Sequence, residues 1–182
     1  PEFIRQAASD ALHGGATRYG PAAGEPQLRE AIAAKLQRCN GMDVSPQQVL
    51  VTNGGKQALY NLFQVLLDPG DEVLIPAPYW LTYPELAGLA GASVKVLPSS
   101  ASDGFRLDLQ ALEALITPNS RLLVLNTPSN PTGLVLQKHE LEGVAELLRR
   151  HPQVAVVCDE IYEHLLDDAQ THHGLASLAP DL

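Results

Sequence analysis

Short apolar runs alternate along the chain with longer segments whose apolar positions recur every three or four residues. The short runs predict strands at 49–52, 72–75, 93–97, 122–125 and 154–158. The helical spacing predicts helices at 26–39, 56–67, 79–90, 109–116 and 138–150. Because strands of four or five continuous apolar residues are typical of sheets covered on both faces, the pattern predicts an α/β fold, with a mostly parallel sheet and helices on both faces.

Breaker residues punctuate this pattern. Asp68, Pro69 and Gly70 end one helix, and Gly41 ends the first one. Pro84 is expected in or near the first turn of its helix, where its missing N–H costs nothing. No repeat, low-complexity tract or linker interrupts the chain, so we expect one continuous domain over 1–182.

Composition narrows the classes of partner. A chain of 182 residues that is 45% apolar can bury a sizeable core. Its 21 acidic and 12 basic residues give a net charge of −9, which argues against a nucleic-acid partner. No apolar run is long enough to span a membrane. Cys39 and Cys158 are too far apart in sequence to indicate a disulfide framework, which favours a cytoplasmic location.

Polar groups follow two of the predicted strands directly. Residues 126–133 (Asn-Thr-Pro-Ser-Asn-Pro-Thr-Gly) come after one apolar run, and residues 159–162 (Asp-Glu-Ile-Tyr) come after another. Ligands bind at the carboxyl ends of strands in open α/β sheets. The amide of Asn130, the carboxylate of Asp159 and the phenol of Tyr162 could therefore hold one flat, polar heteroaromatic ring.

Each of these three residues also has a purely structural interpretation. A buried carboxylate at Asp159 needs a partner, and a protonated ring nitrogen, a helix N-cap or a salt bridge would all serve. Tyr162 could reach the same ligand or pack in the core. The prolines and glycine around Asn130 stiffen its loop, which could fix the amide for a ligand or simply form a turn.

Two further features could contribute to a binding site. Gly54, Gly55 and Lys56 lie between a predicted strand and a helix, where free N–H groups at the positive end of the helix dipole suit a phosphate. A plain tight turn is the alternative, since the motif matches no nucleotide-binding pattern. Trp80, the only tryptophan, could stack on a ligand ring or anchor the core.

Other reactive residue types give weaker signals. Cys158 is expected to be an inert, buried thiol. The six histidines lack metal-ligand spacing, and His172 and His173 lie in a polar stretch that we expect to be exposed. No Gly-x-Ser-x-Gly motif is present.

Taken together, these motifs resemble the fold-type I pyridoxal-phosphate enzymes, specifically the class I aminotransferases. The similarity runs from residues 19–24 (Tyr-Gly-Pro-Ala-Ala-Gly) to Glu163, and its most specific parts are 128–133 and 159–162. Residues 55–58 (Gly-Lys-Gln-Ala) and 78–85 (Pro-Tyr-Trp-Leu-Thr-Tyr-Pro-Glu) are most similar to the bacterial aspartate aminotransferase branch.

The resemblance implies a role for each motif residue toward pyridoxal 5'-phosphate. Asp159 would pair with the ring nitrogen, so that the ring accepts electrons from the amino acid's α-carbon. Tyr162 would bind the phenolic oxygen and act with Asp159 in catalysis. Asn130 would bind the same oxygen and contact the substrate carboxylate. Trp80 would stack on the ring and flank the substrate.

The resemblance also implies a phosphate site and a homodimer. Gly54, Gly55 and Lys56 would bind the cofactor phosphate. Tyr19 would reach across the dimer interface to the phosphate of the neighbouring subunit.

The Schiff-base lysine of the family would lie beyond the end of this chain. Lys35 and Lys138 are expected on exposed helix faces, Lys95 lies in a strand away from the motifs, and Lys56 is near the phosphate site, so none of the four lysines fits that role.

By resemblance, the chain is a partial cofactor-binding large domain that lacks the N-terminal arm and the C-terminal small domain. In the family's sheet, two strands that would follow this segment separate the strand at 49–52 from the other four. Because unpaired internal edges invite aggregation, we expect the chain to be a portion of a longer polypeptide.

The expected function is amino-group transfer between an L-amino acid, with aspartate favoured, and a 2-oxo acid. Related scaffolds leave a β-lyase, an aromatic aminotransferase or an aminocyclopropane-carboxylate synthase open. A non-catalytic module that binds pyridoxal phosphate is a further alternative. An unrelated doubly wound nucleotide-binding fold is disfavoured, because no nucleotide phosphate loop is present.

Overall fold

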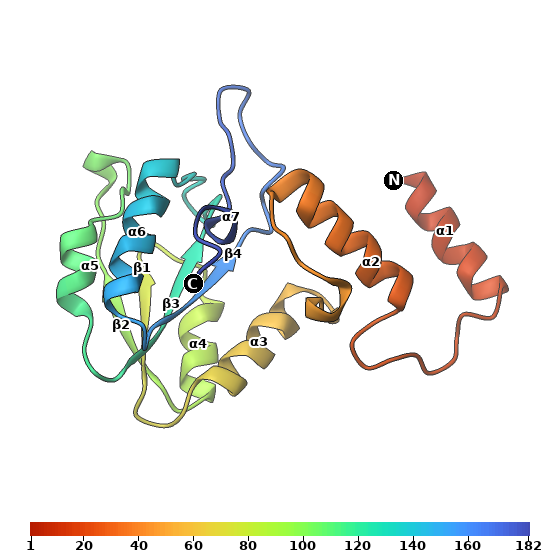
Figure 1. The fold of residues 1–182 in the computed structure, drawn as a ribbon, viewed down its shortest axis with the longest axis horizontal. Helices are drawn as coiled ribbons and strands as arrows, with labels where there is room; N and C mark the ends of the chain where they lie inside the picture. Colours follow the sequence, from red (N-terminus) through yellow and green to blue (C-terminus); the bar gives the residue numbers. More distant parts are fainter.

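The computed structural model describes residues 1–182 and contains a single parallel sheet (Figure 1). Its strands are β1 (Glu72–Pro76), β2 (Ser93–Leu97), β3 (Ser120–Asn126) and β4 (Ala155–Asp159). They lie in the order β2-β1-β3-β4, and every pairing is parallel. The predicted fold class is confirmed, and each of these four strands agrees with its predicted range to within two residues at either end.

The helices lie between and around these strands. They are α1 (Glu2–His13), α2 (Pro26–Lys35), α3 (Gly55–Leu66), α4 (Thr82–Leu89), α5 (Leu109–Leu115), α6 (Lys138–Arg150) and α7 (Leu175–Leu178). A π-helical turn, Leu36–Asn40, continues α2 to Gly41, which adopts a left-handed conformation and ends the helix as expected. Short 3₁₀ turns occur at Pro46–Gln48 and Ala101–Asp103. None of the helices combines the length and apolar character needed to cross a bilayer.

The sheet is covered on both faces, as predicted. Alternate strand residues point to opposite faces. Leu74, Leu123 and Leu125 pack with α5, α6 and α7 in one apolar cluster. Ile75 and Val124 pack with α3 and α4 in a second cluster. The two layers of helices leave the carboxyl ends of the strands accessible at one edge.

Helix α4 begins later than predicted, at Thr82 and not at residue 79. The segment from Pro76 to Pro78 contains two prolines, which hold the chain away from helical geometry after β1. Pro84 then occupies the first turn of α4, as expected. This delay places Trp80 in the connection between β1 and α4.

The strand predicted at 49–52 is absent, which is a correction to the sequence interpretation. Val49 has extended backbone angles (φ −100°, ψ 125°), but the segment pairs with none of the four strands. Its polar backbone groups bond instead to the α2 region: the Val51 N–H donates to the Ala23 carbonyl (2.9 Å), and the Arg29 Nε donates to the Val49 carbonyl (2.9 Å). A strand requires a neighbour that matches its ladder of donors and acceptors, and no strand lies beside this segment.

The N-terminal helices pack loosely. Helix α1 buries none of its residues, and α2 buries only Ala33. Figure 1 shows both helices extending away from the sheet, with α1 farthest from it. The backbone at Gly24 packs closely against Val51 of the 49–52 segment. A side chain at position 24 would not fit, because its Cβ would lie 2.6 Å from the Val51 Cβ.

Candidate functional site

A cleft of about 270 Å³ opens at the carboxyl edge of the sheet, beside the ends of β3 and β4 and the first turn of α3. Its volume is slightly below the roughly 300–1,000 Å³ that is usual for small-molecule pockets. Ten residues line it: Gly55, Lys56, Leu59, Trp80, Tyr83, Asn126, Asn130, Asp159, Ile161 and Tyr162. Six of the eight residues singled out from the sequence are therefore brought together in one place.

Asp159 ends β4 and is held from two directions. The Tyr83 hydroxyl donates a 2.8 Å hydrogen bond to its Oδ2, and the Ile161 N–H approaches its Oδ1 at 3.3 Å. Tyr83 is almost fully buried on α4. Burial, together with the hydrogen bond to Asp159, raises the pKa of the Tyr83 phenol above its ordinary value of 10. Tyr83 therefore stays a donor and fixes the orientation of the carboxylate in the cleft.

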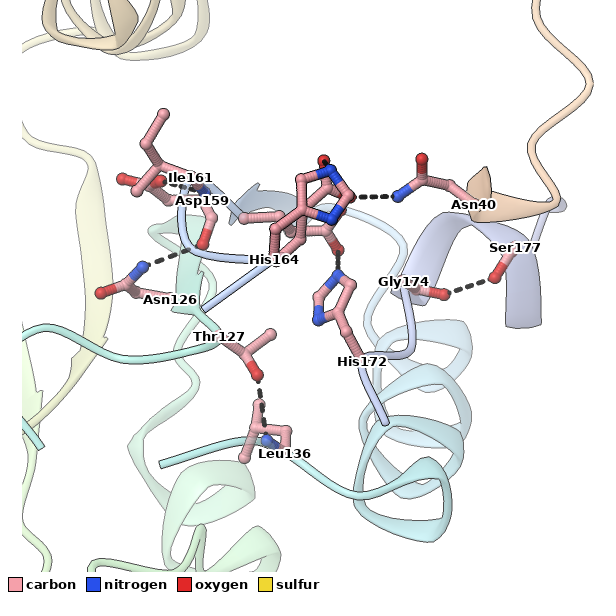
Figure 2. Close-up of polar contacts among 12 residues, drawn as sticks. Asn40, Asn126, Thr127, Leu136, Asp159, Ile161, His164, His172, Gly174 and Ser177 are labelled. Carbon is pink, nitrogen blue, oxygen red and sulfur yellow. Dashed lines mark hydrogen bonds and ion pairs between the residues drawn. The ribbon is translucent and has the colours of Figure 1, made fainter. Parts of the chain in front are cut away.

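Asn126 ends β3 beside Asp159, and the two residues are register partners. Its Nδ2 donates to the Asp159 carbonyl (2.9 Å), and its Oδ1 accepts from the Asn130 N–H (2.7 Å). Figure 2 shows the Asn126 amide reaching toward Asp159 from the neighbouring strand. Asn126 thus ties the end of β4 to the loop that carries Asn130, whose own side-chain amide is left available to the cleft.

The aromatic wall of the cleft consists of Trp80 and Tyr83. Their rings meet edge to face, with centroids 5.6 Å apart at an angle of 89°. The Lys56 Nζ lies 5.0 Å from the centroid of the Trp80 ring, within cation–π range. The indole is half-buried and borders the cleft, so it can both contact a flat ligand and help orient the lysine.

The first turn of α3 provides an open anion site. Gly54 has φ 85°, a left-handed conformation that favours glycine, and α3 starts at the next residue. A Cβ at Gly54 or Gly55 would meet no atom within 4 Å, so nothing crowds the helix N-terminus. The first N–H groups of a helix lack partners within it and carry partial positive charge.

Tyr19 lies apart from these groups. Its side chain is fully exposed, and it does not line the cleft. Gly54 does not line the cleft either but directly precedes Gly55, which does. Tyr162 lines the cleft, and its hydroxyl makes no hydrogen bond within the chain.

Three of the four lysines lie outside the cleft. Lys95 pairs with Glu72 (3.4 Å) at the opposite end of the sheet, and Lys138 pairs with Glu142 (3.7 Å) on the surface of α6. Lys35 differs from the expected exposed position, because it forms an ion pair with Glu163 that leaves 30% of its side chain accessible.

Cys158 and His172 lie beside the site, and the sequence predicts the environment of each. Cys158 is half-buried, so the expectation of a buried thiol holds only in part; desolvation raises the pKa of its thiol to about 12, which disfavours the reactive thiolate. The expectation that His172 is exposed is wrong. Only 8% of its side chain is accessible, because it packs behind the turn that follows β4 near Glu160.

Sequence reasoning missed Tyr83 and Asn126. Asn126 had a usable signal, because it follows an apolar run just as Asp159 does, and parallel strands bring such positions to one edge. Tyr83 had none, since its contact with Asp159 spans 76 positions and depends on how α4 packs on the sheet.

Known proteins match this chain along its whole length. A model of the family described as aminotransferase class I and II matches residues 1–181. A bifunctional aspartate aminotransferase and glutamate/aspartate-prephenate aminotransferase of Petunia hybrida is 49% identical over 98% of the chain. An aspartate/prephenate aminotransferase of Thermus thermophilus is 47% identical over 100% of it.

Solved structures agree in backbone geometry. An aspartate aminotransferase from Thermus thermophilus with maleate superposes with a TM-score of 0.95 at 47% identity, over 99% of this chain and 47% of the other. An aspartate aminotransferase from Rhizobium meliloti gives a TM-score of 0.97 at 42% identity, over 100% of this chain and 46% of the other. An aromatic aminotransferase from Pyrococcus horikoshii gives 0.94 at 39% identity, over 97% of this chain and 47% of the other.

The chain belongs to the class I and II aminotransferase family, and its fold is the fold-type I arrangement of that family. It spans 37% of the length of the Petunia relative and 46% of the Thermus relative.

Proposed function

We propose that the full-length protein containing this chain transfers an amino group from an L-amino acid, with aspartate favoured, to a 2-oxo acid, with pyridoxal 5'-phosphate as cofactor. Residues 1–182 would form part of its cofactor-binding large domain. The observation that carries the proposal is that Asn130, from the loop after β3, lines one cleft with Trp80 and with Asp159 and Tyr162, from the turn after β4. Membership of the aminotransferase family supports the same reaction class.

The residues of the cleft fit this cofactor. When bound, pyridoxal phosphate supplies a conjugated pyridine ring that withdraws electron density from the amino acid's α-carbon. The Asp159 carboxylate, oriented by Tyr83, would keep a proton on the ring nitrogen. The side chains of Asn130 and Tyr162, free of hydrogen bonds within the chain, would donate to the phenolic oxygen. Trp80 would cover one face of the ring.

The phosphate would bind at the start of α3. The open N–H groups after Gly54 and Gly55 suit an anion, and the Lys56 ammonium at the border of the cleft adds charge. Since Lys35, Lys95 and Lys138 lie elsewhere and Lys56 would serve the phosphate, the lysine that links covalently to the cofactor would come from outside this chain. The present segment alone would then lack activity.

The Asp159→Asn variant of the full-length protein tests the site. An amide is similar in size but cannot carry the charge that stabilises a protonated ring nitrogen. We expect kcat to fall roughly 10²–10³-fold, as it does when one preorganised electrostatic group is removed. Asp168→Asn, on the exposed loop after Tyr162, is the matched control and should retain activity. Full activity of Asp159→Asn would contradict the assignment.

The substrates follow from the relatives by analogy. Proteins named for aspartate and prephenate are 41–49% identical to this chain, so we propose aspartate as donor and 2-oxoglutarate or prephenate as acceptor. The match to an aromatic aminotransferase makes an aromatic donor the second candidate. A coupled assay on the full-length protein distinguishes them, since absence of oxaloacetate from aspartate would remove the first candidate.

A β-lyase and a non-catalytic binding module are tested by different measurements. A β-lyase would release pyruvate from cysteine conjugates, which an aminotransferase would not. A non-catalytic module would bind pyridoxal phosphate without forming an imine with a lysine. It would therefore lack the visible absorption band of the imine, which borohydride abolishes by reduction. Mapping the reduced label to one lysine would support an enzyme.

Assembly and location are proposed on single observations. Tyr19 is fully exposed and does not line its own chain's cleft, which suits a role at the cofactor phosphate of a second subunit in a homodimer. A monomer in sedimentation velocity of the full-length protein would contradict this.

Cys39 and Cys158 are both free thiols, which favours a cytoplasmic location of the protein. Fractionation of cells would test this location.

A further inference from the structure

The turn after β4 presents its side chains in two directions. Asp159 and Tyr162 line the cleft, whereas Glu160 and Glu163 lie behind it and keep only 20% and 18% of their side chains exposed. Figure 2 shows Asp159 and His172 on opposite sides of this turn. The Glu163 N–H donates to the Glu160 carbonyl (3.0 Å), so the two rear residues are part of one compact turn. The rear side chains are therefore attached to the same backbone turn as the groups at the front.

Glu163 is held by the end of α2 and the π-helical turn that continues it. The Lys35 Nζ forms an ion pair with Glu163, the Asn40 Nδ2 donates to its Oε2 (2.6 Å), and Lys35 also donates to the Asn40 Oδ1 (2.8 Å). Burial would raise the pKa of Glu163, but the hydrogen bonds from Lys35 and Asn40 outweigh it and hold that pKa below its usual range. This three-residue ring contains an ion pair and joins segments more than 120 positions apart.

Glu160 faces a second partner, from the segment that leads into α7. The His172 Nε2 lies 3.6 Å from the Glu160 Oε1, and both ring nitrogens of His172 are buried without a hydrogen-bond partner. Gly174 packs against the same carboxylate, because a Cβ at position 174 would lie 3.3 Å from the Glu160 Oε1. A buried carboxylate and a buried imidazole at this separation have each other as the nearest charge partner.

We propose that Glu160, through His172, and Glu163, through Lys35 and Asn40, are positioning residues that hold the turn so that Asp159 and Tyr162 meet the cofactor ring at a fixed spacing. This inference rests on the proposed function, because it assigns the rear contacts a role in binding pyridoxal phosphate. One turn then carries both sets of side chains. Asp159 and Tyr162 face the ligand, and Glu160 and Glu163 connect the turn to the α7 and α2 regions.

The test compares Glu160→Gln and Glu163→Gln with the wild type in the full-length apoprotein. Each substitution preserves the size of the side chain and removes its charge. We expect the Kd for pyridoxal phosphate to rise about tenfold, as for loss of a charge-assisted contact in a partly buried site. The pH midpoint of the bound cofactor's visible absorption should shift, and amide exchange at 160–165 should quicken without change in β3. Lys35→Met should behave like Glu163→Gln, and Lys35→Arg should restore most of the affinity.

Glu146→Gln, on the exposed face of α6, is the matched control and should match the wild type in every measurement. If Glu160→Gln and Glu163→Gln bind the cofactor with the wild-type Kd and absorption midpoint, the positioning role is overturned, even where the melting temperature falls. If the wild-type protein itself binds no pyridoxal phosphate, the proposed function fails and the positioning role fails with it. Unchanged amide exchange at 160–165 would show that these contacts do not hold the turn.

Discussion

The Asp159 carboxylate illustrates how one residue depends on contacts that its local sequence does not encode. The end of an apolar run predicted its place at the edge of the sheet. Its orientation, however, comes from the Tyr83 hydroxyl on α4, and its backbone carbonyl is bonded by Asn126 on β3. A phenol that is almost fully buried beside a carboxylate is costly to ionise, because burial and the adjacent negative charge both oppose the phenolate.

Tyr83→Phe tests this contact through the pH dependence of stability. The folded-state pKa of Tyr83 lies above the unfolded value of 10, so the stability it contributes is fully present below pH 10 and is lost as pH rises further. At pH 7 the variant should lose about 1.5–3 kcal/mol, as for a hydrogen bond to a charged group. Above pH 10, wild-type stability should fall more steeply than that of the variant, as measured by urea unfolding of the full-length protein.

Tyr60→Phe is the control, because Tyr60 is 44% exposed and makes no side-chain hydrogen bond within the chain. Equal slopes of stability against pH for wild type and Tyr83→Phe would contradict the assignment.

Individual elements followed the sequence pattern closely where apolar periodicity was strong. Helix α6 and strand β2 have the predicted bounds, because their apolar residues mark one periodicity without ambiguity. The segment 49–52 had an equally apolar run and still formed no strand, since it has no neighbouring strand. Strand formation is therefore a property of a pair, whereas an amphipathic helix needs only a surface to cover.

Helix α3 shows how packing positions a functional terminus. Leu59 and Phe63 point into the core, and Phe63 is completely buried. This contact holds the axis of α3 so that its N-terminus borders the cleft.

Phe63→Ala should destabilise the full-length protein by about 3–5 kcal/mol, because it leaves a large cavity in the core. Val65→Ala, on the same helix but 82% exposed, should change stability by less than about 0.5 kcal/mol. Urea unfolding provides the measurement. A small effect of Phe63→Ala would mean that α3 is not held by this contact.

At the scale of the whole molecule, the two edges of the sheet differ. Strand β2 carries Lys95 at one edge, and a lysine on an edge strand discourages pairing with other chains. Strand β4 forms the other edge, and its first four residues, Ala-Val-Val-Cys, carry no charge. An uncharged edge with free backbone donors and acceptors is a template for association.

We expect the 182-residue chain, expressed alone, to self-associate through β4, and Ala155→Lys to reduce this association. Residue 155 is exposed, so a lysine there leaves the core intact and places charge on the edge. Light scattering at several concentrations measures the effect, and Ala169→Lys, at an exposed loop position, controls for net charge. Equal association of both variants would exclude the β4 edge as the contact.

The sequence by itself determined the alternation of strands and helices, the parallel sheet with two covered faces, and the polar residues that follow β3 and β4. These features depend on local periodicity and on the rule that parallel strands end at one edge. Only the tertiary structure decided that Tyr83 orients Asp159, that His172 is buried, and that Lys35 reaches Glu163. Each of these depends on packing between segments far apart in the chain, where contact is set by the shapes and crossing of whole elements and leaves no pattern in neighbouring residues.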